Sequence, residues 1–447
     1  MSIAARWYRR AARKIGLICI IASLTACGGG GGGSSTSPGS GGTVTPNQAP
    51  TIESLAPLVV LEGSQISLTV TSSDPDGDQL SLSINGADAS FFTLSPGNVV
   101  KFSSLPDWEA REDNDGDNVF EATVTASDGT LSASANFDVT VVDALEGSVV
   151  GGVVSGATVF IDTNKNSVLD QNEDDTKSNA EGAFFLPFPA TTQNAALVAV
   201  GGTDQFTGND LPSLVLSAVI TGAATDHIAI NSFSTLASNL NQSQRERLDA
   251  LLGAKLSLDS ITRQNIWEAA QAGNDAAVDA VRLNMTLGIL LLTVDALFDE
   301  SVESADRIYA ISESLIATEE ENITNLLYSE TAIRKALNQA LTRGGSTQLD
   351  QDSIDAVSAT LSGLSAVIAD TQIAISEPLM RDIISVGQTS LTTAAEELSS
   401  SGSSEAFLQA ASIEALLAPL QANNTGLNTD GDTLIDVLDP DDDNDGV

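Results

Sequence analysis

The chain of 447 residues has little cysteine, histidine, aromatic side chain or positive charge. It contains 2 Cys, 1 His, 4% aromatic residues, and 19 Lys+Arg against 60 Asp+Glu, so its net charge is −41. A surface this acidic repels nucleic acid and anionic lipid, and we expect no nucleic-acid partner. Apolar residues still make up 42% of the chain, which is enough for packed cores, so we do not expect global disorder.

The scarcity of His and Cys also restricts catalysis. A Ser-His-Asp triad would have to use His227, and a lone His beside Asp226 is more often structural. The sequence has no HExxH motif, and both cysteines fall in the first 27 residues, so zinc-protease and thiol chemistry are not expected. Two-carboxylate glycoside hydrolysis stays open as an alternative, although no local pattern singles out one pair of acids. We predict that the protein is not an enzyme.

Residues 1–26 have the pattern of a bacterial secretion signal. Four Arg and one Lys precede an apolar stretch over residues 15–24, which is too short for a membrane span. The letters LTAC, ending at Cys27, resemble the lipobox of bacterial lipoproteins, and an ordinary signal peptide with a chance Cys is the alternative. The resemblance implies a lipid anchor on Cys27, and Gly28 after it implies the outer membrane, on its periplasmic face or at the cell surface. Residues 27–47, rich in Gly and Ser, are expected to be a flexible tether.

Residues 48–144 alternate short β-prone runs with turn residues, which is typical of an antiparallel sandwich. The segments DPDGD from Asp74, PDWEAREDNDGDN from Pro106 and the closing VTVVD resemble bacterial cadherin-like repeats. The resemblance implies calcium at one end of the sandwich on Asp74, Asp76 and Asp128, and at the other end on Glu62, Asp107, Glu109 and Asp143. The acidic loop 113–118 is a further candidate. The chain has one such repeat and the exit VVDALEG in place of an Asp-rich linker, so the second site is expected to be incomplete. Solvated acidic loops without an ion are the alternative.

Residues 145–205 have the sequence pattern of a second, smaller β-sandwich. The pattern resembles carboxypeptidase regulatory-like domains and B-type repeats of adhesins. Its segment DTNKNSVLDQNE fits the register of an EF-hand loop. The ligand positions are Asp162, Asn164, Asn166, Val168 through its carbonyl, Asp170 and Glu173. Leu169 at position eight is apolar, as packing requires, and Ser167 stands at position six where Gly is usual. We predict that this loop binds a calcium ion that stabilises a small β domain.

Residues 206–425 are expected to form an all-α domain, since apolar residues recur at helical spacing from about Ser232 to Leu420. The apolar stretch over residues 287–298 contains Thr293 and Asp295 and is interpreted as a buried central helix. The pattern Gly201, Gly202, Asp204, Thr207 and Gly208 before this domain resembles a segment of bacterial surface lipoproteins. No defined activity follows from that resemblance.

Residues 426–447 are rich in Asp and resemble a thrombospondin type 3 repeat, with a plain acidic tail as the alternative. The expected calcium ligands are Asn428, Asp430, Asp432, Asp436 and Asp439 in one loop, and Asp441, Asp443 and Asp445 in a second loop that begins before the sequence stops. We expect the natural protein to continue beyond residue 447.

The sequence thus predicts a multidomain chain: two all-β sandwich modules, an all-α domain and an Asp-rich calcium-binding tail. Its predicted function is that of a calcium-binding, lipid-anchored cell-surface protein in cell adhesion or matrix contact. The alternative is a stalked receptor whose helical domain captures a carbohydrate, peptide or protein ligand. Calcium is the expected cofactor, because carboxylate and carbonyl oxygens suit it best.

Overall fold

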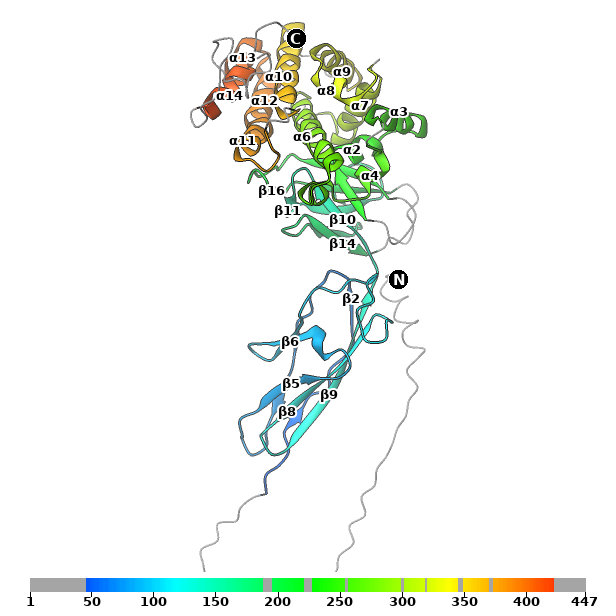
Figure 1. Cartoon of the computed structure of the whole chain (residues 1–447), viewed down its shortest axis with the longest axis vertical. Coiled ribbons are helices and arrows are strands. Elements are labelled where there is room, and N and C mark those ends of the chain that lie inside the picture. The colour runs from blue at the N-terminus through cyan, green and yellow to red at the C-terminus, as the bar shows by residue number, and fades with distance from the viewer. Residues whose placement is uncertain are drawn as a thin grey trace, which may run out of the picture. The chain divides into compact units, whose positions relative to one another are not determined.

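The structure is a computed structural model, and it describes residues 46–421 except 188–194, 221–226, 254–255, 299–300, 318–319, 345–348 and 370–372. The described chain forms two compact units (Figure 1). The first holds most of the chain up to Thr140, and the second holds the chain from Val141 onward. Two short segments, Leu61–Ser64 and Asp107–Ala110, also belong to the second unit. The second unit therefore draws on three separate stretches of the chain.

The first unit is built from three small sheets. One contains, in spatial order, β2 (Leu58–Leu61), β9 (Ser132–Val142), β8 (Val119–Ser127) and β5 (Ser81–Asn85). A second contains β3 (Leu68–Thr69), β7 (Val99–Phe102) and β6 (Phe92–Ser95), which follows the 3₁₀ turn η1 (Ala89–Phe91). The third pairs β1 (Thr51–Ile52) with β4 (Ser72–Ser73).

Period-two alternation explains how this unit closes around its core. Along β8, Phe120, Ala122, Val124 and Ala126 are buried while the residues between them are not. Phe92 of the smaller sheet lies 5.0 Å from the ring of Phe137 in an edge-on contact and stacks on Phe102 at the same centroid distance. Aromatic side chains of this unit thus meet where two of its sheets face each other.

The second unit begins with a β-sandwich. One sheet contains β14 (Ala183–Pro187), β10 (Ala144–Val150) and β18 (Ile228–Asn231), and β10 pairs with β18 in parallel. The other contains β13 (Asp175–Lys177), β12 (Thr158–Asp162), β15 (Ala196–Val200) and β17 (Val215–Val219), and β11 (Val154–Ser155) pairs with β16 (Thr203–Asp204). Buried Val149, Val159, Leu186 and Leu197 belong to the core of this sandwich.

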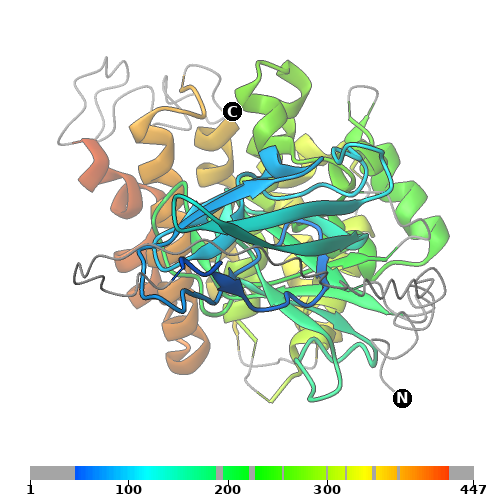
Figure 2. The same cartoon turned by 90° about the horizontal axis from the view of Figure 1, so that it is seen from below.

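Helices follow and pack against these sheets (Figure 1). They are α2 (Ser232–Ser238), α3 (Gln242–Leu252), α4 (Leu258–Thr262), α5 (Ile266–Gln271), α6 (Asp275–Ala296), α7 (Ser304–Ile316), α8 (Ile323–Tyr328), α9 (Glu330–Arg343), α10 (Gln351–Ala369), α11 (Pro378–Val386), the π-helical turn η2 (Gly387–Leu391), α12 (Thr392–Ser401), α13 (Ser404–Ala411) and α14 (Ile413–Gln421). Figure 2 shows the last helices, in orange and red, on the side opposite the green α3. The predicted order, β modules and then a helical region, is confirmed.

Helix α6 is the centre of the helical part, as its apolar sequence indicates. It is the one described helix with the length and composition of a membrane span, and 83% of its most apolar window is buried inside the protein. Asn284, 1% exposed, joins it to the sheet, since its Nδ2 donates to the carbonyl of Val150 at 3.0 Å. Its Oδ1 accepts from the N–H of Ser232 at 3.0 Å. A polar side chain this deep is satisfied only because strand and helix both supply partners.

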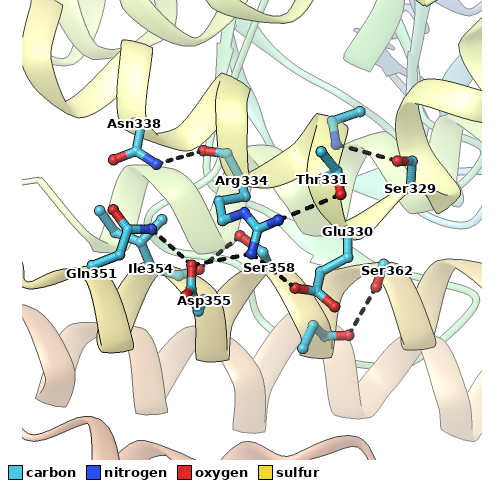
Figure 3. Close-up of polar contacts among 12 residues, drawn as sticks. Ser329, Glu330, Thr331, Arg334, Asn338, Gln351, Ile354, Asp355, Ser358 and Ser362 are labelled. Carbon is cyan, nitrogen blue, oxygen red and sulfur yellow. Dashed lines mark hydrogen bonds and ion pairs between the residues drawn. The ribbon is translucent and has the colours of Figure 1, made fainter.

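Polar contacts on the outer side of the bundle tie α9 to α10 (Figure 3). The Arg334 guanidinium lies 3.4 Å from Glu330 of its own helix and 3.5 Å from Asp355 of α10. Gln351 donates to the same Asp355 carboxylate at 2.7 Å. These side chains are partly exposed, so the contacts contribute little beyond orientation.

The boundary between β and α structure lies later than residue 205. Strands β17 and β18 fall within the range expected to be helical, and Leu292 of α6 belongs to the sandwich core. The sandwich is completed only by β17 and β18, which follow the pattern of Gly201, Gly202 and Asp204. Helices cover one of its faces. The β-sandwich and the helices are therefore one compact unit, where two separate domains were expected.

Candidate metal sites

Three acidic side chains converge where β2 ends. Glu62 follows β2, and Asp107 and Glu109 lie on the short segment before the 113–118 loop. One carboxylate oxygen from each lies within 4.8 Å of the others. Glu62 is only 1% exposed, and it accepts the N–H of Trp108 at 2.9 Å and that of Ala144 at 2.7 Å. The structure thus brings together three of the four residues expected to form the second cadherin-type site.

The fourth residue, Asp143, lies between β9 and β10, and its environment also disfavours charge. Its Oδ1 is buried and accepts no hydrogen bond within the described part of the chain. Burial raises the pKa of Asp143 to about 6, and the negative charge of Glu109 adds to the effect. Burial likewise raises the pKa of Glu62 to about 7 against the hydrogen bonds from Trp108 and Ala144, which lower it. Burial and the charges of Glu109, Asp107 and Asp143 raise the pKa of Glu146.

Carboxylates placed this closely repel one another unless a proton or a cation lies among them. The donors are all hard oxygen atoms, and neither a thiolate nor an imidazole is present in the group. Such a donor set fits Ca²⁺ better than zinc or copper. An unpartnered oxygen on Asp143 adds a free acceptor beside the group.

The residues expected at the other end of the sandwich are arranged differently. Asp74, Asp76 and Asp128 do not form a group of converging carboxylates among the residues that the structure describes. Asp74 Oδ1 accepts the N–H of Asp76 at 2.8 Å, and Asp76 Oδ2 accepts the N–H of Gln48 at 2.6 Å. The N–H groups of Leu131 and Thr130 lower the pKa of Asp128. Turn amides take up much of the bonding capacity that an ion would use, although Asp74 Oδ2 is buried without a partner.

The EF-hand-like loop follows β12, as its sequence predicts. Asp162 is 1% exposed, and its oxygens accept the N–H groups of Lys165 at 2.6 Å and Ser167 at 2.8 Å. Asn164 and Asn166 both direct Nδ2 toward Asp170 Oδ2, at 2.7 and 3.3 Å. Glu173 Oε1 accepts the N–H of Thr163 at 2.7 Å, which closes the loop. The expected ligand side chains therefore face one another around a single turn.

One position of this loop explains how its turn forms without glycine, and another is more exposed than expected. Ser167 adopts a φ of +58°, the left-handed conformation that Gly supplies in an EF-hand, so the turn forms without Gly. Leu169 was expected to pack, but it is 40% exposed, and Val168 beside it is 57% exposed. The reason is that strands flank the loop, and no described element lies over the position-eight side chain.

The 113–118 loop forms a further acidic group, and it includes a partner that sequence patterns did not reveal. Oxygens of Asp113, Asp115 and Asp117 lie within 4.8 Å of one another. Burial tends to raise the pKa of Asp113, but hydrogen bonds from the backbone N–H groups of Asp117 and Asn118 outweigh it and lower that pKa. Buried Asp88 accepts the N–H of Asn114 at 2.7 Å and anchors this loop from 26 positions away. Nothing near Asp88 in the sequence indicates that contact.

Several expected site residues lie outside the described residues. They are the lipidation residue Cys27 and the tail ligands Asn428, Asp430, Asp432, Asp436, Asp439, Asp441, Asp443 and Asp445. The thrombospondin-type and lipoprotein features therefore stay predictions.

The single histidine has a structural partner. His227 Nε2 lies 2.9 Å from the hydroxyl of Ser148, which is 2% exposed in the middle of β10. Burial lowers the pKa of His227, although the charge of Glu268 raises it. A serine this deeply buried cannot reach a substrate as a nucleophile.

Comparisons with known proteins concern the N-terminal module. Residues 47–142 match the family described as bacterial Ig domain. Drosophila N-cadherin EC1–3 is 19% identical over 22% of this chain, with a TM-score of 0.19, and the match spans 35% of that fragment. Human protocadherin-24 EC1–2 is 17% identical over 38% of this chain and 95% of its own, also at 0.19. The titin domains Z1Z2 in complex with telethonin are 15% identical over 40% of this chain and all of their own, at 0.17.

No curated protein matches the chain by sequence. The family match establishes the first module as an Ig-type β domain, which confirms the predicted sandwich for these residues. The finer resemblance, to calcium-binding cadherin repeats, belongs to the proposal below.

Proposed function

We propose that this protein is a calcium-binding, lipid-anchored cell-surface protein that acts in adhesion or matrix contact. The observation that carries the proposal is the group Glu62, Asp107 and Glu109. Asp143, which feels the charge of Glu109, has a buried Oδ1 with no partner in the described part of the chain. These are the residues that the cadherin resemblance assigns to one calcium site. The bacterial Ig domain match supports a module of the kind that surface proteins carry in series.

The position of this group in the chain suggests what calcium would do. Its residues lie on segments 61–64, 107–110 and 141–143, which are far apart in the sequence and all belong to the second compact unit. An ion held by all three segments would restrict their independent motion, because each would supply a ligand to one centre. We infer that calcium stiffens these three segments and so orders this end of the Ig-type module.

Calorimetric titration of Ca²⁺ into the full chain, with and without the change Glu62→Gln, tests this function. The substitution keeps the shape of the side chain and removes its charge, so it should remove one class of calcium sites and leave the others. Glu53→Gln, at an exposed acid of the same module, is the matched control. Equal titration curves for all three proteins would contradict the proposed site.

A second proposed function is ligand capture by the helical part of the second unit. A cavity of about 360 Å³ lies beside α3 and α4, lined by polar side chains that include His227, Arg245, Glu246 and Arg263. Its mixed charges suit a small polar ligand, such as a sugar or peptide end. Glycan and peptide arrays probed with the full chain test this, and Glu246→Gln should remove any array signal that depends on the cavity.

We also propose that the protein catalyses no turnover of an external substrate. The hydrogen bond of His227 to a buried serine supports this, since it leaves the histidine in a structural role. A hydrolase activity that persists in His227→Gln and disappears on mutation of one acidic pair would contradict it.

A further inference from the structure

The pattern Gly201, Gly202, Asp204, Thr207 and Gly208 forms one tight turn around β16. The three glycines have φ values of +67°, +104° and +80°, which L side chains rarely adopt. A Cβ on Gly202 would lie 2.7 Å from a Val154 methyl group, so the turn needs Gly to lie against β11. The turn holds Asp204, 1% exposed, in a fixed position under its own loop.

A distorted helix faces this turn. Residues 387–391 form the π-helical turn η2 between α11 and α12, and such turns commonly occur at functional sites. Gly387 lets the turn approach α6, since a Cβ there would lie 2.5 Å from Ile289 Cδ1. The next residue, Gln388, extends toward the 204–209 turn.

Three side chains of the turn converge on the Gln388 carboxamide, 181 positions away from Thr207. The Thr207 hydroxyl donates to Gln388 Oε1 at 2.8 Å, and Asn209 Nδ2 donates to the same oxygen at 3.1 Å. Gln388 Nε2 donates to Asp204 Oδ2 at 2.6 Å. The Asp204 carboxylate lies within reach of the Thr207 hydroxyl as well as of the amide nitrogen, so rotation about the Cβ–Oγ1 bond can turn the single hydroxyl proton from Gln388 Oε1 to Asp204.

We propose that Thr207 and Gln388 join in an intramolecular ester, formed by the folded protein itself. Thr207 Oγ1 attacks Gln388 Cδ, a C–O bond forms, and the C–N bond of the carboxamide breaks. The hydroxyl proton passes through Asp204 to the departing nitrogen, which leaves as ammonia. Atoms balance without an oxidant or a co-reactant, because the alcohol and the primary amide give the ester and NH₃.

Each neighbour has a role that acyl transfer requires. Asn209 donates to the oxygen on which negative charge develops, as an oxyanion-hole donor does. Asp204 contacts the group that loses a proton and the group that gains one, as a general acid–base must. Burial raises the pKa of Asp204 against the hydrogen bonds from Gln388 and Phe206, so its carboxyl can carry a proton more readily than a solvated Asp.

Peptide mapping of the full chain by mass spectrometry after trypsin tests the ester. Cleavage at Lys177, Arg245 and Arg381 places Thr207 in peptide 178–245 and Gln388 in peptide 382–447. The proposal predicts one joined species whose mass is the sum of the two peptides less one ammonia, and hydroxylamine should separate it. Recovery of both peptides unjoined and at full mass from the folded chain would overturn the proposal.

Substitutions separate the chemistry from mere packing. Thr207→Val and Asp204→Asn should abolish the joined species, and Thr207→Ser, which keeps the hydroxyl, should retain it. Ser385→Ala is the matched control, because Ser385 contacts Asn209 at 3.0 Å and takes no part in the transfer. Circular dichroism checks that each variant is folded, and Thr207→Ser keeps the test valid if Thr207→Val is not. A joined species that persists unchanged in Asp204→Asn would overturn the role of Asp204.

Discussion

At the scale of single residues, Glu62 is an acid whose ionised form is unfavourable in the absence of a cation. It is almost fully buried beside Asp107 and Glu109, and its pKa lies near 7 because burial outweighs two backbone hydrogen bonds. A calcium ion would replace the proton there. In the proposed function, Glu62 therefore links pH, calcium binding and stability.

This linkage predicts a specific pH dependence in EDTA. Burial raises the pKa of Glu62 from 4.5 to about 7, so the folded state holds a proton that the unfolded state has lost between those values. The contribution of Glu62 to the free energy of unfolding is thus fully present below about pH 4.5 and is lost as pH rises through about 7. Asp143 acts in the same direction between 3.8 and about 6.

Urea denaturation from pH 5 to 8 measures this effect as the difference between wild type and Glu62→Gln, so that other acids cancel. In EDTA the wild type should lose stability relative to the variant as pH rises, and millimolar Ca²⁺ should reverse the order at pH 8. A difference that does not change with pH would show that Glu62 ionises normally.

Ser167 gives a second prediction at this scale. Its φ of +58° is unfavourable for any residue with a Cβ. Ser167→Gly should therefore stabilise the protein by about 0.5–1 kcal/mol in thermal or urea unfolding. Exposed Val168, which has no positive φ, is the control: Val168→Gly should destabilise it by a similar amount, and the same sign for both changes would contradict the account.

At the scale of elements, the contact between α6 and β10 is the critical one. Asn284→Leu would leave the carbonyl of Val150 and the N–H of Ser232 without their partner in a buried place. We expect a loss of about 2–4 kcal/mol, because each buried unsatisfied group costs about 1–3 kcal/mol. Urea denaturation measures it, and Arg334→Gln, on the outer side of α9, should change stability by under about 1 kcal/mol. Equal losses for the two would contradict the assigned importance of α6.

How much the sequence predicts depends on how local each element is. The 162–173 loop could be predicted because its ligands are contiguous and their spacing carries the register. The central burial of α6 follows from its apolar composition. Strand β17 pairs with the nearby β15, but it follows the pattern at residues 201–208, after which the helical domain was expected to begin. Strand β18 could not be predicted from local patterns, because it pairs with β10 far earlier in the sequence, at Gly147↔Ile228. The contacts of Asp88 with Asn114 and of Thr207 with Gln388 are invisible for the same reason.

At the scale of the whole molecule, the second unit should not divide at the expected domain boundary. The sandwich core includes Leu292 of α6, and Val150 of β10 belongs to the helical core. A chain shortened to end at Asn231 should therefore fail to show a cooperative thermal transition for residues 144–231, although the Ig-type module before it can still fold. Two independent transitions for strands and helices in the full chain would contradict this coupling.

In the proposed function, the role of calcium depends on three segments of the second unit, 61–64, 107–110 and 141–143. Segments 61–64 and 107–110 supply the carboxylates of one acidic group, and Asp143 of the third segment feels the charge of Glu109, so we predict that one ion acts on all three. The loop at Asp162 and the tail beyond residue 425 would bind further ions without this mechanical consequence. We therefore expect the ion at Glu62 to restrict three separate segments, and each of the other ions to order only the loop that binds it.

The most direct test of the central claim is hydrogen exchange of the full chain in Ca²⁺ and in EDTA, for wild type and for Glu62→Gln. The account predicts that calcium slows exchange in segments 61–64, 107–110 and 141–143 together, and that Glu62→Gln removes this protection while the 162–173 loop keeps its own. Protection that is absent from the three segments, or that is unchanged in Glu62→Gln, would contradict it.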